Sequence, residues 1–184
     1  MDHLTTMDFD LQPGNLQNEL VTIRPVKIND FERLYQVASD PLIWEQHPTT
    51  NRYKREVFEQ FFDAAIKSES AFIVFDTNTD EPIGSSRFYE YDKDKKTIAV
   101  GYTFLARAYW GTRYNRALKS LMLNYAFNFV NTVIFHIGTD NIRSQKAIEK
   151  LGAKKIEQVE IKYYEDQSAL HYVYHIDREV WERN

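Results

Sequence analysis

The spacing of apolar residues along the chain alternates between two patterns, one typical of strands and one typical of amphipathic helices. Strands are predicted at residues 20–26 (LVTIRPV), 71–75, 82–91, 97–105 (TIAVGYTFL) and 132–137 (TVIFHI), and again at about 153–164 and 169–176. The run 132–137 is apolar almost throughout, as expected for a strand buried on both faces. A charged tip at 92–96 separates the third and fourth strands, and a turn at 165–168 separates the last two.

Helices are predicted between these strands. The first begins after Asn29 or Asp30, either of which can cap it, and ends at Asp40 because the residue before a proline resists the helical conformation. A second helix spans about 54–67, a third follows the strand at 97–105, and a fourth spans 141–151 and ends at Gly152. The third helix carries these apolar residues on one side: Leu118, Leu121, Met122, Tyr125 and Phe129. A short helix at 177–183 closes the chain.

The turn between the strand at 97–105 and the third helix is the most informative segment of the sequence. Its six residues are Trp110, Gly111, Thr112, Arg113, Tyr114 and Asn115. A short turn that leads into a helix leaves several backbone N–H groups unpaired, and the helix dipole adds partial positive charge at the same end. The turn therefore predicts a phosphate site, although such turns also serve as plain connectors.

Composition limits the classes of function. With 43% apolar residues, the 184-residue chain can bury one substantial core, so we expect a domain at 19–184 after a loosely held lead-in at 1–18. The net charge is -4 with both signs mixed, which argues against nucleic-acid and membrane partners. The absence of cysteine excludes thiol nucleophiles and disulfides. The first residues lack the features of a secretory leader, and a cytoplasmic protein is expected.

The order of these elements, together with several short motifs, resembles the GNAT superfamily of acetyl-CoA-dependent N-acetyltransferases, and within it the branch of RimJ and RimL. The motifs are Ile23, Arg24 and Pro25 in the first strand, Gly101 and Tyr102 in the fourth, Trp110 and Gly111 in the turn, Asn141 and Ser144 in the fourth helix, and Leu151 and Gly152 after it. The resemblance implies a single α/β domain of the mixed α+β kind, with a twisted mixed sheet of about seven strands flanked by helices. It also implies that the sheet splays between its fourth and fifth strands, where the pantetheine arm enters.

The resemblance further implies an activity, the transfer of an acetyl group from acetyl-CoA to a primary amine by direct attack through a tetrahedral intermediate, with no metal. The turn at 110–115 would hold the pyrophosphate, Phe104 and Leu105 would lie along the cofactor, and backbone N–H groups near Tyr102 would stabilise the oxyanion. Asn141 would position the thioester arm, in addition to capping its helix, and Ser144 would protonate the leaving thiolate. Tyr102 is the next candidate proton donor.

Three residues depart from the usual pattern of the family, and the first is Asn115, which stands where a glycine or alanine is common. Arg113 stands where a glycine is common, so its side chain either turns outward or adds a guanidinium to the phosphate site. Ile148 stands where many members place a tyrosine that protonates the thiolate. These departures leave an alternative open, a catalytically degenerate module that binds acyl-CoA.

The acceptor side is less determined. The loop at 44–53 carries Trp44, Glu45 and His47, which the resemblance places over the acceptor, unless the loop is a simple connection with Trp44 in the core. The general base is open among Glu45, His47, His136, Glu160 and His171. The acceptor is expected to be a small-molecule amine or a protein N-terminus. The edge strands of the terminal hairpin offer a surface for a homodimer.

Overall fold

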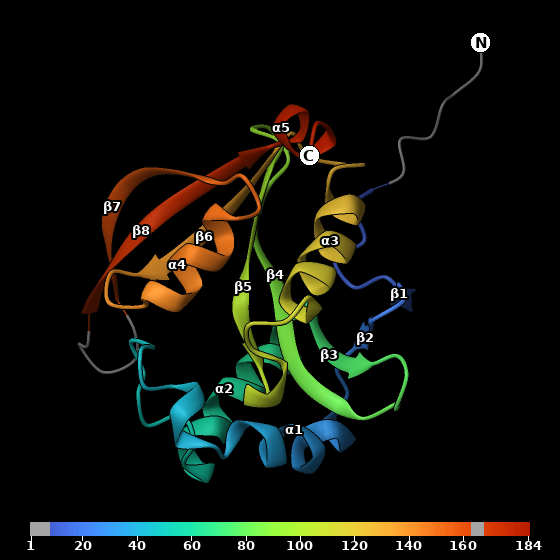
Figure 1. Ribbon diagram of the computed structural model, residues 1–184, viewed down its shortest axis with the longest axis vertical. Coiled ribbons are helices and arrows are strands. Elements are labelled where there is room, and N and C mark those ends of the chain that lie inside the picture. The colour runs from blue at the N-terminus through green and yellow to red at the C-terminus, as the bar shows by residue number, and fades with distance from the viewer. Residues whose placement is uncertain (1–7, 163–167) are drawn as a thin grey trace.

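In the computed structural model, which describes residues 8–162 and 168–184, the chain forms a mixed sheet with helices on both faces (Figure 1). Among these residues the sheet has eight strands in the order β1-β2-β3-β4-β5-β6-β8-β7. In chain order their bounds are β1 (Leu16–Gln17), β2 (Val21–Pro25), β3 (Ala71–Asp76), β4 (Pro82–Asp92), β5 (Thr97–Leu105), β6 (Thr132–Gly138), β7 (Lys154–Lys162) and β8 (Ser168–Asp177). The predicted mixed α/β fold is confirmed, with the two-residue β1 as one strand more than expected.

The helices divide between the two faces of the sheet. They are α1 (Phe31–Ala38), α2 (Arg55–Ser68), α3 (Tyr114–Ala126), α4 (Ile142–Glu149) and α5 (Arg178–Glu182), with short 3-10 turns η1 (Ile28–Asp30), η2 (Pro41–Ile43) and η3 (Arg107–Tyr109). Phe72 and Val74 of β3 belong to the core cluster that contains α3, whereas Ile73 and Phe75 belong to the cluster under α1 and α2. Because side chains alternate along a strand, β3 is buried on both faces.

The sheet opens between β5 and β6, as the family resemblance implied. These two strands are parallel and pair only over Thr97–Thr132, Ile98–Val133 and Ala99–Ile134. Beyond Ala99, β6 continues to pair with β8 on its other side, and the two halves of the sheet diverge (Figure 1). The stretch of β5 from Val100 to Leu105 therefore keeps an open backbone edge on the side of β6.

A bulge deforms β5 at the point where the sheet opens. Arg87 pairs with Gly101 and Ser85 with Phe104, so Tyr102 and Thr103 both face Ser86. Tyr102 takes up the extra residue in a left-handed conformation, with φ at 51°. Gly84 permits the close approach of β4, because a Cβ there would lie 1.9 Å from the carbonyl oxygen of Phe104.

The described part of the lead-in contacts the domain. Phe9 is buried and its ring stacks on Phe129 at 4.6 Å between centroids. Phe129 itself lies beyond the end of α3 at Ala126, although the pattern placed it within that helix. The boundary between residues 18 and 19 stays a prediction. Of the turn expected at 165–168, residues 165–167 lie outside the described residues and Ser168 begins β8.

Candidate active site

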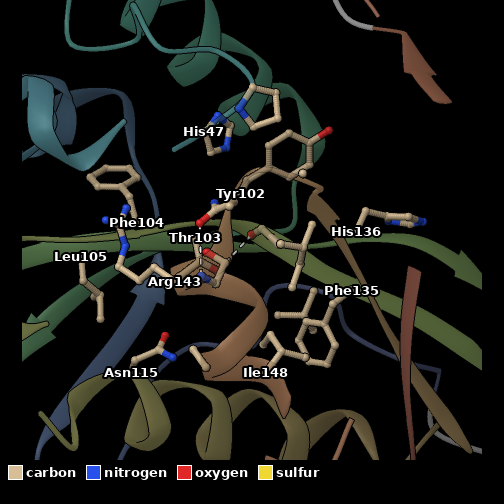
Figure 2. Close-up of a pocket in the computed structure, with 18 of the residues that line it drawn as sticks. His47, Tyr102, Thr103, Phe104, Leu105, Asn115, Phe135, His136, Arg143 and Ile148 are labelled. Carbon is tan, nitrogen blue, oxygen red and sulfur yellow. Dashed lines mark hydrogen bonds between the residues drawn. The ribbon is translucent and has the colours of Figure 1, made fainter. Parts of the chain in front are cut away.

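A cavity of about 270 Å³ lies in the opening between β5 and β6. Its walls come from the strands β4 to β8, from α3 and α4, and from two loops. These loops are residues 44–53, here named the acceptor loop, and residues 110–115, the phosphate loop. Figure 2 shows Thr103 and Phe104 of β5 above Asn115 of α3, with Ile148 of α4 beside them. Segments far apart in the sequence therefore converge on one space.

The phosphate loop lies at one end of the cavity. Gly111 adopts a φ of +68°, and a Cβ on it would meet nothing within 4 Å, so its surroundings are open. Within the described chain, no hydrogen bond is formed by the N–H groups of Gly111, Thr112 and Arg113. Unpaired amides at the start of a thirteen-residue helix suit a phosphate ligand. The loop thus has the features of an anion site, and its binding of the cofactor pyrophosphate stays a prediction.

The six residues predicted in this loop do not all face the cavity. Trp110, Gly111 and Asn115 line it, whereas Thr112 and Arg113 are exposed and do not. Tyr114 turns away, and its hydroxyl donates to Asp76 at 3.1 Å. Arg113 is therefore exposed outside the cavity lining, and its contribution to the phosphate site stays a prediction.

Trp110 anchors the loop to the sheet and contacts α4. Its indole N–H donates to the carbonyl oxygen of Leu105 at 2.9 Å, and the Arg143 guanidinium lies 3.7 Å from its ring centroid. Arg143 also donates to the carbonyl oxygen of Ile43 at 3.2 Å. Burial lowers the pKa of Arg143, while Glu45 raises it in part. The arginine thereby bridges the two halves of the sheet across the cavity.

Asn141 and Ser144 meet at the start of α4. The Asn141 side-chain oxygen accepts the backbone N–H of Ser144 at 3.1 Å, so Asn141 is the N-cap of this helix. Both residues also line the cavity, together with the buried Ile148 one turn later. Asn141 therefore both caps α4 and lines the cavity, as the sequence indicated. The acid role of Ser144 stays a prediction.

Tyr102, Phe104 and Leu105 also line the cavity. Tyr102 is 40% exposed, and its ring lies 4.1 Å from the Arg87 guanidinium and 5.1 Å from the ring of Tyr89. Phe104 is buried against Trp44, with ring centroids 5.2 Å apart. Phe104 therefore packs into the core, whereas Tyr102 faces the opening.

The acceptor loop closes one end of the opening. Trp44 is 2% exposed and its indole N–H donates to the carbonyl oxygen of Ala38 at 2.8 Å, so much of its role is packing. Pro48 contacts the end of β6, because a Cβ on Gly138 would lie 2.9 Å from its Cγ. Trp44 and His47 line the cavity, whereas Glu45 does not. The loop thus reaches across from one half of the sheet to the other.

Three of the five candidate bases line the cavity: His47, His136 and His171. Glu160 lies in an exposed pair with Ser168. The pKa of His47 is well below its ordinary value, because of burial first and then the positive charge of Arg52. Burial likewise lowers the pKa values of His136 and His171. All three imidazoles are therefore neutral near pH 7 and able to accept a proton.

The two ring nitrogens of His171 differ in role. Nδ1 lies 2.9 Å from the carbonyl oxygen of Ala169, which can only accept, so Nδ1 carries the proton and Nε2 is the basic nitrogen. The contacts of His47 are less suitable for a base, since Nδ1 accepts from the Thr49 N–H at 3.2 Å and Nε2 lies 3.4 Å from the Arg52 guanidinium.

Sequence reasoning missed Lys119, Thr103 and Arg52, all of which line the cavity. Lys119 had a detectable signal. It follows Asn115 by four residues and precedes Met122 by three, which places a charge on the apolar face of the helix. Arg52 and Thr103 had no comparable signal, because loops and bulges lack a period against which a residue stands out.

The comparisons with known proteins agree with this geometry. Residues 21–154 match the family model described as acetyltransferase (GNAT) domain. No curated protein is significantly similar to the chain in sequence. Within the described part of the chain, no helix is long and apolar enough to cross a membrane.

Several solved structures share the fold at low sequence identity. A GCN5-related N-acetyltransferase from Brucella melitensis superposes with a TM-score of 0.80 at 16% identity, over 95% of this chain and 85% of that one. Spermidine N-acetyltransferase from Vibrio cholerae, in complex with CoA and spermine, gives 0.69 at 15%, over 90% and 99%. RimJ from Mycobacterium smegmatis, in complex with CoA-disulfide, gives 0.68 at 14%, over 90% and 87%.

Proposed function

This chain belongs to the GNAT acetyltransferase family, and on this premise we propose that it acetylates a primary amine by direct attack on acetyl-CoA, through a tetrahedral intermediate. It is an acetyl-CoA-dependent N-acetyltransferase. One observation carries the proposal. A single cavity joins the unpaired amides of the phosphate loop to the bulge of β5, along an edge of the sheet that is open from Val100 to Leu105.

The acetyl donor supplies an activated thioester when bound, and different residues along the cavity hold its different parts. The amides of Gly111 to Arg113 bind the pyrophosphate. The open backbone edge at Phe104 and Leu105 pairs with the extended arm. Asn141 uses its side-chain amide to orient the thioester end, and the Ser144 hydroxyl donates a proton to the leaving sulfur.

The bulge of β5 supports a role in charge stabilisation. Backbone N–H groups alternate between the two sides of a strand, and β5 pairs with β6 only as far as Ala99, so the N–H groups beyond it that point away from β4 face the opening, and the bulge at Tyr102 changes their spacing. Amides fixed in such positions stabilise an oxyanion without having to reorganise. We assign these amides to the carbonyl oxygen of the acetyl group.

We assign the general base to His171. Its Nδ1–H is held by the carbonyl oxygen of Ala169, so Nε2 carries the lone pair that can accept the proton of the ammonium acceptor. Burial lowers the pKa of His171 and keeps the imidazole neutral near pH 7. Replacement of His171 by Gln should remove the acidic limb of the pH–rate profile, and an unchanged limb would exclude this assignment.

The acceptor is proposed to be a small-molecule amine or a protein N-terminus, and the chain to be a member of the RimJ and RimL branch. The fold of RimJ from M. smegmatis supports this branch. The spermidine enzyme of V. cholerae supports a small amine equally well. A homodimer through the exposed edge strand β7 is part of the same proposal.

Release of free thiol from acetyl-CoA tests the function. The purified protein is incubated with acetyl-CoA and a panel of polyamines, amino sugars, amino acids and N-terminal peptides, and free thiol is measured with a chromogenic disulfide. The chain itself contributes no background, since it has no cysteine. Thiol release that depends on one class of amine supports the proposal. Binding of acetyl-CoA without thiol release from any amine would favour the degenerate module instead.

A further inference from the structure

A lysine is buried in the wall of the cavity. Lys119 lies in the second turn of α3, is 3% exposed, and donates a hydrogen bond from Nζ to Thr103 Oγ1 at 2.6 Å. That hydroxyl in turn lies 2.8 Å from Ser86 Oγ. Thr103 is one of the two bulged residues of β5, so the Lys119 side chain ends directly beneath the bulge.

The environment of this ammonium is unfavourable for a charge. No carboxylate of the described segments lies within ion-pair distance of it, and burial alone lowers the pKa of Lys119 to about 7. The charged or titratable groups that share the cavity come from every neighbouring element: His47, Arg52, Tyr89, Glu90, Tyr102, Tyr109, His136, Arg143 and His171. None of them contributes to the lowered pKa.

A lysine in such a position weakens the fold. Removing an ammonium from water is costly, and one hydrogen bond to a hydroxyl returns only part of that cost. An apolar side chain of similar length would fill the same space between Leu118 and Met122 without it. A buried, perturbed lysine in the wall of a cleft is therefore a candidate for function.

We propose that Lys119 is a positioning residue for acetyl transfer, whose ammonium, held under the β5 bulge by Thr103, stabilises the negative charge that develops at the thioester carbonyl. This inference rests on the proposed function. As the N–C bond forms, the carbonyl π pair moves to oxygen. The pair then returns as the C–S bond breaks, Ser144 gives its proton to the sulfur and regains one from the attacking nitrogen, and Lys119 keeps its own proton throughout.

The position of Lys119 separates this role from phosphate binding. Lys119 follows the first residue of α3 by five residues, or about 7 Å along the helix axis. Its Nζ donates to Thr103 of the bulge, whereas the phosphate loop lies before and at the first turn of the helix. An ammonium placed behind the oxyanion donors acts on the transition state more than on the bound ground state, and thus on rate more than on affinity.

The absence of cysteine permits a sharp test. Lys119→Cys introduces a single thiol, and alkylation with 2-bromoethylamine converts it to a side chain of lysine length whose amine has a lower pKa because of the neighbouring sulfur. Lys119→Met removes the charge, and Lys67→Met, at an exposed position of α2, is the matched control. For each protein, kcat and kcat/KM are measured against pH, and CoA affinity is measured by calorimetry to show that the fold is retained.

We expect Lys119→Met to lower kcat by about 10²-fold while CoA affinity stays nearly unchanged. The aminoethylated Lys119→Cys protein should regain most of the rate, with the basic limb of its pH profile displaced to lower pH. If Lys119 had a purely structural role, the modified side chain would restore the rate without moving the basic limb of the pH–rate profile. That result would overturn the proposal. A Lys119→Met enzyme at the wild-type rate would also overturn it.

A second readout does not depend on activity. In the intact protein labelled with ¹³C at lysine Cε, one lysine should titrate near pH 7, and this signal should be missing in Lys119→Met. A Lys119 that is neutral throughout the pH range in which the enzyme is active would overturn the proposal even if the variant were slow, because no ammonium would then be present. If the wild-type protein acetylates no amine, the proposed function fails, while this titration still reports on the buried ammonium.

Discussion

The side-chain oxygen of Asn141 accepts a hydrogen bond from the backbone N–H of Ser144, so the residue proposed to orient the thioester also begins the helix that carries the proposed acid. This double role makes stability and catalysis separable by mutation. Asn141→Ala removes both the cap and the side-chain amide and should cost about 1 kcal/mol of unfolding free energy while raising the KM for acetyl-CoA. Asn141→Asp keeps an oxygen cap but lacks the amide donor.

The two variants are compared by urea denaturation and by steady-state kinetics. Asn141→Asp should retain nearly the full unfolding free energy and still show the raised KM. A normal KM in both variants would leave Asn141 as a helix cap alone.

Ser144→Ala should lower kcat by about 10²-fold or more with CoA affinity nearly intact, because it removes the hydroxyl and leaves the backbone N–H that Asn141 caps. Rates with any accepted amine are measured from about pH 6 to pH 9, the range in which the histidines and the amine titrate. Ser120→Ala, in α3 and outside the cavity lining, is the control. A full rate throughout would exclude the acid role and direct attention to Tyr102 or water.

Acetyl-CoA should stabilise the native state, because its binding residues come together only in the folded sheet. A ligand present at about 100 times its dissociation constant adds about 2.7 kcal/mol when it binds the native state alone. Differential scanning calorimetry with millimolar acetyl-CoA measures the shift in melting temperature. A melting temperature that stays constant across that range would contradict the assignment of the cavity.

Gly111→Val should weaken CoA binding, because a β-branched residue disfavours the φ of +68° that presents the amides of the phosphate loop. The cause would be conformation, since a Cβ at Gly111 has open space around it. Gly14→Val is the matched control, because Gly14 has equally open surroundings and is not among the residues that line the cavity. Equal CoA affinities in both variants would indicate that the loop is a plain connector.

Lys119→Met should stabilise the protein in a pH-dependent way. The folded state holds the pKa of Lys119 at about 7, so the unfolded chain binds the extra proton between about pH 7 and pH 10. The wild-type protein therefore gains stability as pH rises through this window. Relative to wild type, Lys119→Met should be more stable by up to about 5 kcal/mol below pH 7, and the difference should vanish above about pH 10.5. Denaturation of both proteins at pH 6 and at pH 10.5 measures the difference in unfolding free energy at the two limits of this window. An equal difference at both pH values would show that the change in packing, not the charge, determines it.

Periodicity alone determined the order of the longer strands and helices, because a buried face imposes a repeat of two on a strand and about three and a half on a helix. The apolar run 132–137 predicted the strand β6, whose bounds are Thr132–Gly138, and the turn before α3 predicted an anion site at its N-terminus. Gly152, expected at the end of the fourth helix, adopts the left-handed φ of +95° that such an end requires. The strand and the helix end depend on residues close together in the sequence, so local pattern was sufficient for them, whereas the anion site stays a prediction.

Tertiary structure decided the features that depend on distant residues. The bulge at Tyr102 arises from the pairing of β5 with β4, and the contact of Pro48 with Gly138 joins segments ninety residues apart. The hydrogen bond from Lys119 to Thr103 likewise depends on how α3 packs against the sheet. No local pattern contains these contacts, because each depends on an angle between elements that only the packing of the whole core determines.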